Sequence, residues 1–282
     1  MPISNAVCDL INGLPPLKNI IRDNDLRATK ALGQNFLCDL NLTRKIARQA
    51  DIQPTDHIIE IGPGPGGLTR GILLEGATDL TAIEFDPRAV KALSSLNNAS
   101  ENRLNLIHGD ALKDNMLRFG TDGNRKIIAN LPYNIATPLL IDWLRDIHAN
   151  GANAYQSITV MVQKEVAERM AAHDNTKPYG RLSVLVQWLC DARICFDVPA
   201  TAFVPPPKVT SSIIQLTPKK RDDNIDFKTV EKLTEMAFGQ RRKMIRQTLK
   251  PHINVIHDLD IDETLRAENL SVEDFLNIAK RV

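Results

Sequence analysis

The feature that most constrains this chain is an alternation of short apolar segments with helix-like segments over roughly its first 200 residues. Segments rich in Ile and Val are predicted as strands at His57–Ile61, Leu80–Phe85, Leu104–His108, Lys126–Asn130 and Ile158–Gln163. Helices are predicted around them at Asp39–Ala50, with Asp39 as N-cap, and at Gly66–Glu75, Pro87–Leu96 and Thr137–His148. Near-continuous apolar strands that alternate with helices indicate an α/β fold, with a mostly parallel sheet covered on both faces.

The pattern changes near residue 220. Arg193–Val198 and Ser211–Thr217 are predicted strands, and the loop Pro199–Val209 between them is too rich in proline to form a helix. Beyond the polar linker Lys219–Asn224 the pattern is purely helical, with helices predicted at Phe227–Phe238, Lys243–Lys250 and Val272–Arg281. We therefore predict an N-terminal extension at 1–28, an α/β domain at 29–220 and a small all-helical domain at 221–282.

Charge is unevenly distributed along the chain. The 35 Lys and Arg residues nearly balance the 34 Asp and Glu residues, and a net charge of +1 at first argues against a nucleic-acid partner. Residues 18–50, however, hold seven basic and three acidic residues, and residues 206–250 hold 11 basic and five acidic residues. Such basic blocks form either solvated faces or surfaces that bind RNA, and charge alone does not separate the two.

Several classes of protein are disfavoured by what the sequence lacks. No apolar run approaches the ~20 residues that cross a bilayer, and the N-terminal segment with Asp9, Pro15 and Pro16 is a poor signal peptide. The four cysteines show no C-x-x-C spacing, which is typical of a reducing compartment. The six histidines lack the spacing of metal ligands. We expect a cytoplasmic protein with no membrane partner and no metal.

A glycine-rich turn follows the first predicted strand, within residues 60–69. Gly62, Gly64 and Gly67 satisfy the G-x-G-x-x-G pattern of dinucleotide-binding proteins, and glycines let the backbone approach a ligand closely. The two prolines of this turn, however, remove N–H donors that would bind a pyrophosphate. A ligand with an adenosine and an amino-acid group but no phosphate has no need of these donors. The turn therefore favours S-adenosylmethionine over a nicotinamide cofactor.

Acidic residues lie at the ends of the next two predicted strands. Glu84 lies 22 residues beyond Gly62, where a carboxylate can accept hydrogen bonds from both hydroxyls of a ribose. Asp110, followed by Ala111, lies where a carboxylate can accept from an adenine amino group. Acids at strand ends are also common as helix caps or exposed groups. Because α/β sheets bind ligands at the carboxyl edge of their strands, we expect these residues and the glycine turn to form one site.

The segment Asn130–Tyr133, with the sequence Asn-Leu-Pro-Tyr, follows the fourth predicted strand. The exocyclic amine of adenine is a poor nucleophile because its lone pair is delocalised into the ring. Acceptors from the Asn130 side chain and the Leu131 carbonyl would favour a pyramidal nitrogen, and Tyr133 would stack on the extruded base. A sulfonium methyl is already electrophilic, so positioning the amine suffices. This segment therefore predicts methyl transfer to adenine N6.

With these motifs the chain resembles the small-subunit (16S) ribosomal RNA adenine dimethyltransferases over residues 29–250. The resemblance is carried, in order, by Leu32–Leu37, Glu60–Thr69, Glu84, Asp110, Asn130–Tyr133, Gln163–Arg169, Tyr179–Ser183, Phe203–Val209 and Phe238–Lys243. It implies a Rossmann-like class I S-adenosylmethionine-dependent methyltransferase domain followed by a small all-helical domain that binds RNA. It also implies a monomer that releases S-adenosylhomocysteine.

The resemblance further implies which residues bind the cofactor. These are Gln34, Asn35, Leu37, Gly62, Gly64, Glu84, Asp110, Ala111 and Asn130. The first three would close over the methionine part, and Gly62 would contact it from the glycine turn. Glu84 would bind the ribose, Asp110 the adenine, and Asn130 both the cofactor and the target amine.

The catalytic and RNA-binding residues follow from the same resemblance. The catalytic residues would be Asn130, Leu131, Pro132, Tyr133 and Phe203. Phe203 would stack on the target adenine opposite Tyr133, and the ordinary alternative is that this aromatic only anchors its loop. Lys208, Arg241, Arg242 and Lys243 would contact RNA phosphates.

The expected function is dimethylation of the N6 amines of two adjacent adenines near the 3′ end of 16S ribosomal RNA, within an immature small subunit. Methylation of large-subunit ribosomal RNA is an alternative within the same chemistry, and residues 238–243 favour the small-subunit group. A non-catalytic assembly factor is an alternative of another class, against which the intact Asn130–Tyr133 segment and Glu84 speak. A nicotinamide oxidoreductase is disfavoured by the prolines of the glycine turn.

Overall fold

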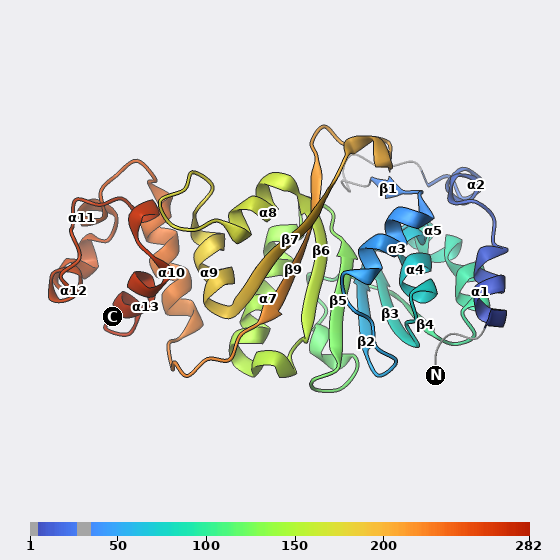
Figure 1. Cartoon of the computed structure of the whole chain (residues 1–282), viewed down its shortest axis with the longest axis horizontal. Coiled ribbons are helices and arrows are strands. Elements are labelled where there is room, and N and C mark those ends of the chain that lie inside the picture. Colours follow the sequence, from blue (N-terminus) through green and yellow to red (C-terminus); the bar gives the residue numbers. More distant parts are fainter. Residues whose placement is uncertain (1–4, 27–34) are drawn as a thin grey trace.

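A seven-stranded sheet runs through the centre of the computed structural model, which describes residues 5–26 and 35–282 (Figure 1). The strands are β2 (His57–Ile61), β3 (Asp79–Glu84), β4 (Leu104–His108), β5 (Arg125–Asn130), β6 (Ser157–Gln163), β7 (Cys190–Val198) and β9 (Ser211–Pro218). Their order across the sheet is β4, β3, β2, β5, β6, β9, β7. The first five pair in parallel, whereas β9 is antiparallel to both of its neighbours. The mostly parallel sheet predicted from the apolar segments is confirmed.

The sheet separates two apolar cores, because successive side chains of a strand point to opposite faces. In β2, Ile58 belongs to one core, whereas Ile59 and Ile61 belong to the other. Helices on the Ile58 side are α3 (Leu40–Arg48), α4 (Gly67–Leu74), α5 (Pro87–Ala92) and α6 (Ser94–Ala99), and helices on the other side are α7 (Ala136–Asn150), α8 (Lys164–Ala171) and α9 (Arg181–Leu189). Both faces are therefore covered, as the apolar strands require.

Local hydrogen bonds set the ends of several helices. The carboxylate of Asp39 accepts from the N–H of Asn41 at 2.9 Å, so the predicted N-cap of α3 is confirmed. The single helix predicted over Pro87–Leu96 is wrong, because α5 and α6 are separate helices. The hydroxyl of Ser94 donates to the carbonyl of Lys91 at 2.8 Å, and such a bond competes with the main-chain bonding of a continuous helix.

The part of the chain beyond the linker is helical, as predicted. It contains α10 (Phe227–Gly239), α11 (Ile245–Thr248), α12 (Ile253–Asp258) and α13 (Val272–Ala279). The helices α10 and α13 pack against α9, where Trp188 stacks on Phe227 with ring centroids 6.0 Å apart. One apolar core continues from the sheet into these helices. The division into domains at residue 220 stays a prediction.

The N-terminal extension folds as two short helices beside α4, α5 and α6 (Figure 1). They are α1 (Asn5–Asn12) and α2 (Leu17–Asp23). After them, β1 (Phe36–Leu37) pairs antiparallel with β8 (Phe203–Val204), so that Leu37 lies opposite Phe203. This two-stranded sheet joins the start of the α/β part to the proline-rich loop.

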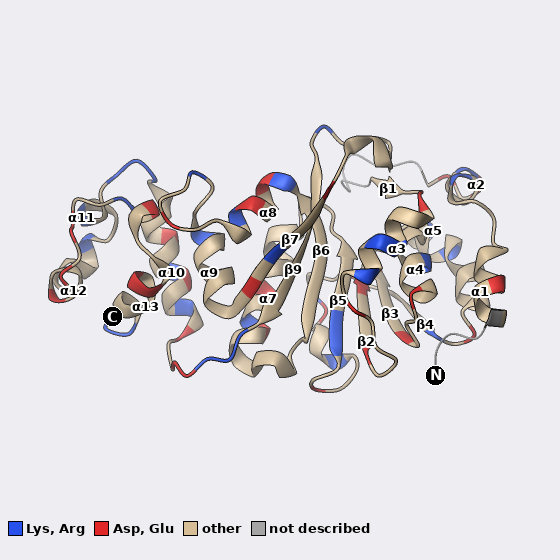
Figure 2. Cartoon of the chain, viewed as in Figure 1, with Lys and Arg blue, Asp and Glu red and all other residues tan. Residues whose placement is uncertain are grey.

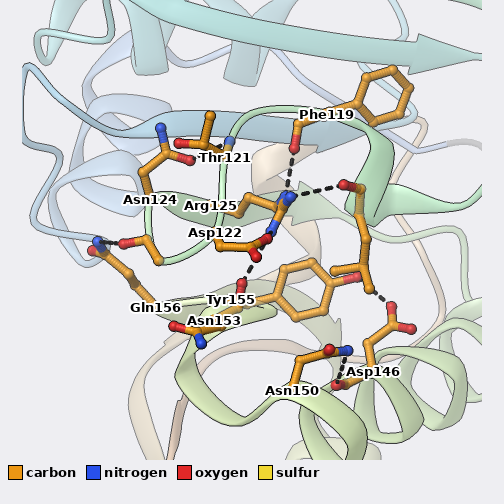
Figure 3. A network of polar contacts seen from close by, with 12 residues as sticks. Phe119, Thr121, Asp122, Asn124, Arg125, Asp146, Asn150, Asn153, Tyr155 and Gln156 are labelled. Carbon is orange, nitrogen blue, oxygen red and sulfur yellow. Dashed lines mark hydrogen bonds and ion pairs between the residues drawn. The ribbon is translucent and has the colours of Figure 1, made fainter.

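A buried polar network lies at the amino end of β5, opposite the carboxyl edge of the sheet (Figure 3). The guanidinium of Arg125 donates to three main-chain carbonyls at 2.5 to 3.0 Å and pairs with Asp122 at 3.0 Å. Close by, the hydroxyl of Tyr155 donates to Asp146 at 2.6 Å. Asp122 belongs to the segment 121–124, which forms a turn before β5. The network therefore anchors this turn and the start of β5.

Candidate active site

A cavity of about 240 Å³ opens at the carboxyl ends of the parallel strands β2, β3, β4 and β5. Its walls come from residues 35–37, 60–65, 67–68, 83–86, 109–111 and 130–135. The expected cofactor residues are all in these walls except Gln34, which lies outside the described part of the chain. Parallel strands bring their carboxyl ends to one edge of the sheet, and this explains why segments far apart in sequence meet here.

The glycine turn between β2 and α4 forms one part of the cavity wall. Gly62, Gly64 and Gly66 have φ angles of 67°, 54° and 91°, in the left-handed region that favours glycine. At Gly64 a Cβ atom would lie 3.2 Å from the ring of Phe36, which is a closer approach than most side chains allow. The N–H of Gly64 donates to Glu84 at 2.9 Å. The turn is thus shaped by backbone conformation and by contact with β1 and β3.

Glu84 at the end of β3 is buried and faces the cavity. Its Oε2 accepts from the N–H of Gly64, and its Oε1 accepts from the N–H of Asp86 at 2.7 Å. Burial raises the pKa of this carboxyl, and the two backbone donors oppose that rise. Each carboxylate oxygen can accept more than one hydrogen bond, so Glu84 keeps the capacity to accept ribose hydroxyls.

Glu60, the residue two before Gly62, is a cavity residue that the sequence prediction missed. Only 1% of it is exposed, and its Oε2 has no hydrogen-bond partner in the described residues. Burial raises the pKa of this carboxyl to about 8. A buried oxygen without a donor points to a ligand group that supplies one. The available signal was a carboxylate between the isoleucines of a predicted strand, two residues before the first glycine of the turn.

Asn130 ends β5 and lies in the opposite wall. Its side-chain Nδ2 donates to the carbonyl of Asn35 at 3.3 Å, which leaves Oδ1 as the acceptor of this amide. The following Leu131 is buried, and its N–H donates to the carbonyl of Met161 in β6 at 3.2 Å. Pro132 lies next to Gly62 of the glycine turn. The Asn-Leu-Pro-Tyr segment is thereby held against both the sheet and the glycine turn.

Tyr133 completes this segment and is half-buried at the cavity wall. Its hydroxyl lies 2.8 Å from that of Ser211 at the start of β9, and Ser211 is fully buried. Burial raises the pKa of the phenol, and this keeps it neutral at physiological pH. Ser211 was not singled out from the sequence, because nothing local connects it to a residue 78 positions earlier.

Phe203 is only 3% exposed and belongs to the core on the Ile58 side of the sheet. It does not line the cavity and instead pairs with Leu37 across the two-stranded sheet. The stacking role expected for Phe203 stays a prediction.

Asp110 and Ala111 line the cavity after β4. Asp110 accepts from the N–H of Leu112 at 3.2 Å and pairs with Lys113 at 3.3 Å.

The cations expected to bind RNA fall into two groups. Lys208 is exposed on the loop between β8 and β9, and Arg242 and Lys243 are exposed between α10 and α11, where basic residues are visible in Figure 2. Arg241 is engaged within the protein: it pairs with Glu268 at 3.0 Å and donates to the carbonyl of Tyr179 at 3.2 Å. Its guanidinium is thus partly used to hold the helical part onto the loop between α8 and α9.

Residues 5–26 and 35–282 contain no cluster of His, Cys, Asp and Glu that could hold a metal ion. Among the helices formed by these residues, none is long and apolar enough to cross a membrane.

The fold and the cavity together define a class of protein. The chain has the features of a class I S-adenosylmethionine-dependent methyltransferase. These are a Rossmann-like sheet, a glycine turn poor in N–H donors, the acid Glu84 at the end of β3 and an Asn-Leu-Pro-Tyr segment. A sequence model of the family described as "Ribosomal RNA adenine dimethylase" matches residues 25–282. The chain therefore belongs to this family, and the fold class and enzyme class predicted from the sequence are confirmed.

Similar proteins agree with this assignment. The chain is 49% identical over 271 residues to "Ribosomal RNA small subunit methyltransferase A" of Rhizobium johnstonii, which covers 95% of this chain and 98% of that protein. It is 48% identical over 279 residues to the protein of the same name from Mesorhizobium japonicum, with 96% and 99% coverage.

Solved structures show the same fold. A dimethyladenosine transferase from Plasmodium falciparum superposes with a TM-score of 0.74 at 27% identity, covering 86% of this chain and 95% of that one. The 23S rRNA methyltransferase ErmE superposes with a TM-score of 0.66 at 22% identity, covering 88% and 99%. At that identity the likeness to ErmE concerns the fold alone.

Proposed function

We propose that this protein transfers methyl groups from S-adenosylmethionine to the N6 amines of two adjacent adenines near the 3′ end of small-subunit (16S) ribosomal RNA. The observation that carries the proposal is the arrangement of the cavity, in which the Asn130–Tyr133 segment faces the glycine turn and Glu84. Relatives that match nearly the full chain are named for methylation of small-subunit ribosomal RNA, and this favours that substrate over large-subunit RNA.

The chemistry of the cavity fits the cofactor. The unpartnered oxygen of buried Glu60 suits an ammonium group, and S-adenosylmethionine carries one on its methionine part. Glu84 would hold the ribose hydroxyls, and Asp110 with Ala111 would hold the adenine. Asn35 and residues of the glycine turn would flank the methionine part. When bound, the cofactor supplies an electrophilic methyl group on its sulfonium.

The protein's own groups then position the target amine. The bond from Asn130 Nδ2 to the carbonyl of Asn35 fixes the amide, so Oδ1 accepts one hydrogen of the adenine N6 amine. The carbonyl of Leu131 accepts the other, and the lone pair on N6 is then free to attack. Tyr133, held by Ser211, presents its ring to the extruded base. After transfer, the methylated N6 loses one proton to solvent. The second transfer starts from this monomethylated amine, whose one remaining hydrogen is donated to one of the two acceptors, and yields the dimethylated amine.

The finer partners belong to the same proposal. Exposed Lys208, Arg242 and Lys243 would bind RNA phosphates, so affinity would fall with salt. The substrate would be 16S RNA within an immature small subunit, bound by a monomer in the cytoplasm. A non-catalytic assembly factor is the alternative, and it requires none of the positioning around Asn130.

The decisive experiment is to incubate the protein with labelled S-adenosylmethionine and immature small subunits and to map the modified nucleotides. We expect dimethyladenosine at two adjacent positions. Asn130→Ala should nearly abolish transfer while RNA affinity stays within about twofold of wild type, because this side chain contacts no phosphate. Absence of adenine methylation under conditions in which the cofactor binds would refute the enzymatic proposal, and label in large-subunit RNA would support the alternative substrate.

A further inference from the structure

Helix α2 of the N-terminal extension packs behind one wall of the cofactor cavity. Ile20 of α2 and Leu26, which follows it, form a small apolar cluster with Phe36 of β1. Ala89 and Ala92 of α5 complete this cluster. Ile20 is 7% and Leu26 1% exposed, so both side chains are committed to this contact. Phe36 also lines the cavity, and its ring therefore connects this part of the extension with the site.

The position of Phe36 bears on both of its sequence neighbours. Asn35 accepts the hydrogen bond that orients the amide of Asn130, and Leu37 is paired with Phe203 of β8. The ring itself lies against the glycine turn, as the close approach at Gly64 shows. A shift of the ring would thus be transmitted to the turn and to the acceptor of the Asn130 amide.

A second, polar contact joins the extension to the ribose side of the cavity. The guanidinium of Arg88 in α5 donates to the carbonyl of Asp25 at 3.2 Å and to the carboxylate of Asp86 at 2.7 Å. The N–H of Asp86 in turn donates to Glu84 at 2.7 Å. The end of the extension is therefore connected, through two residues, to the expected ribose acceptor.

We propose that the N-terminal extension is a positioning element of the cofactor site, in which Ile20 and Leu26 hold Phe36, and with it β1, in the conformation that binds S-adenosylmethionine. This inference rests on the proposed function, because it takes that cofactor as the ligand. Without this support, β1 would populate other conformations, and the apparent affinity for the ligand would fall by the fraction that remains competent. Ile20 and Leu26 do not line the cavity themselves, whereas Phe36 of the same apolar cluster does.

The test compares two buried aliphatic side chains in the full-length protein. Leu26→Ala removes the contact behind Phe36, whereas Ile256→Ala shortens a fully buried side chain on α12, which lies at the opposite end of the molecule from α2 (Figure 1). Affinity for S-adenosylmethionine is measured by calorimetry without RNA, and thermal unfolding is measured in parallel. Leu26→Ala should raise the Kd about tenfold, as expected if about one molecule in ten keeps the competent conformation. Ile256→Ala should lower the unfolding midpoint without changing the Kd.

A milder variant guards against loss of folding. Ile20→Val removes one methyl group and should raise the Kd in the same direction by a smaller factor. The proposal would be overturned by equal effects of Leu26→Ala and Ile256→Ala on the Kd. It would also be overturned if the variants lowered the unfolding midpoint without changing the Kd, because the extension would then contribute only to stability. Wild-type methylation is assayed separately. If the wild type binds the cofactor but methylates no adenine, the proposed function is refuted, and the proposed role of the extension in cofactor binding is unaffected.

Discussion

Cofactor binding should release a proton from Glu60. In the free protein, burial raises the pKa of this carboxyl to about 8, so about 0.9 of the molecules carry it protonated at pH 7. An ammonium group placed against it favours the ionised form and lowers its pKa. Binding at pH 7 should therefore release close to one proton per site from Glu60, and this release should vanish as the pH rises through 8.

The assay is titration calorimetry of S-adenosylmethionine at pH 7 in two buffers with different enthalpies of ionisation. The difference between the observed enthalpies gives the number of protons released. Glu60→Gln keeps the size of the side chain but does not titrate, and ionisation of the ligand is common to both proteins. We expect the variant to lose the release and to bind more weakly. The same proton release in wild type and Glu60→Gln would refute the assignment.

The sign of the stability effect follows from the same pKa. The pKa of Glu60 in the folded protein lies above its unfolded value of ~4.3, so the folded state favours the neutral carboxyl. The free protein should thus lose stability as the pH rises from about 4.3 to about 8. The difference between the folded and unfolded pKa of Glu60 corresponds to a free energy on the order of 5 kcal/mol, by which folding disfavours the ionised carboxylate. Chemical unfolding of the free protein between pH 5 and 9 should show that Glu60→Gln loses less stability with rising pH than the wild type does.

Further variants test three separate parts of the molecule. Ser211→Ala removes the hydrogen bond to the hydroxyl of Tyr133 and should lower kcat up to about tenfold while leaving the Kd for the cofactor unchanged; Tyr133→Phe added to it should have little additional effect in a double-mutant cycle. Arg242→Ala should weaken RNA binding and reduce its salt slope by about one. Arg241→Ala should mainly lower the unfolding temperature, because the guanidinium of Arg241 bonds within the protein. A larger loss of RNA binding for Arg241→Ala in filter binding, with a larger drop in unfolding temperature for Arg242→Ala, would contradict this. Tyr155→Phe should cost about 1 kcal/mol in chemical unfolding by removing the hydrogen bond from the buried Tyr155 hydroxyl to the half-buried carboxylate of Asp146, with no change in cofactor affinity.

Much of the fold was predictable because strong local patterns coincide with the tertiary structure. Strands such as β2 carry adjacent isoleucines, whose side chains point to opposite faces of the sheet, and a chain can bury both faces only between two layers of helices. The helix start at Asp39 was predictable because its side chain bonds to N–H groups only two and three residues away. The break between α5 and α6 was not predicted, because a single hydroxyl at Ser94 outweighed an otherwise continuous helical pattern.

The site was predictable to the extent that its residues sit in motifs that carry chemistry. Glu84, Asp110 and Asn130 follow strands, and the carboxyl edge of a parallel sheet brings them together whatever the loops do. The uneven charge also pointed to the exposed loops that bear Lys208, Arg242 and Lys243. Phe203 was singled out by its motif as well, but the structure buries it in the core beside Leu37.

The sequence by itself therefore determined the class of fold, the family and the strand-end residues of the cavity, because each depends on periodicity or on short spacings. Only the tertiary structure decided which distant groups act on those residues. Ser211 meets Tyr133, Asn35 meets Asn130, and the N-terminal extension reaches Phe36 through contacts that no local pattern encodes. The physical reason is that hydrogen bonds and packing depend on distance in space, and the chain closes those distances only when the sheet and its covering helices have assembled.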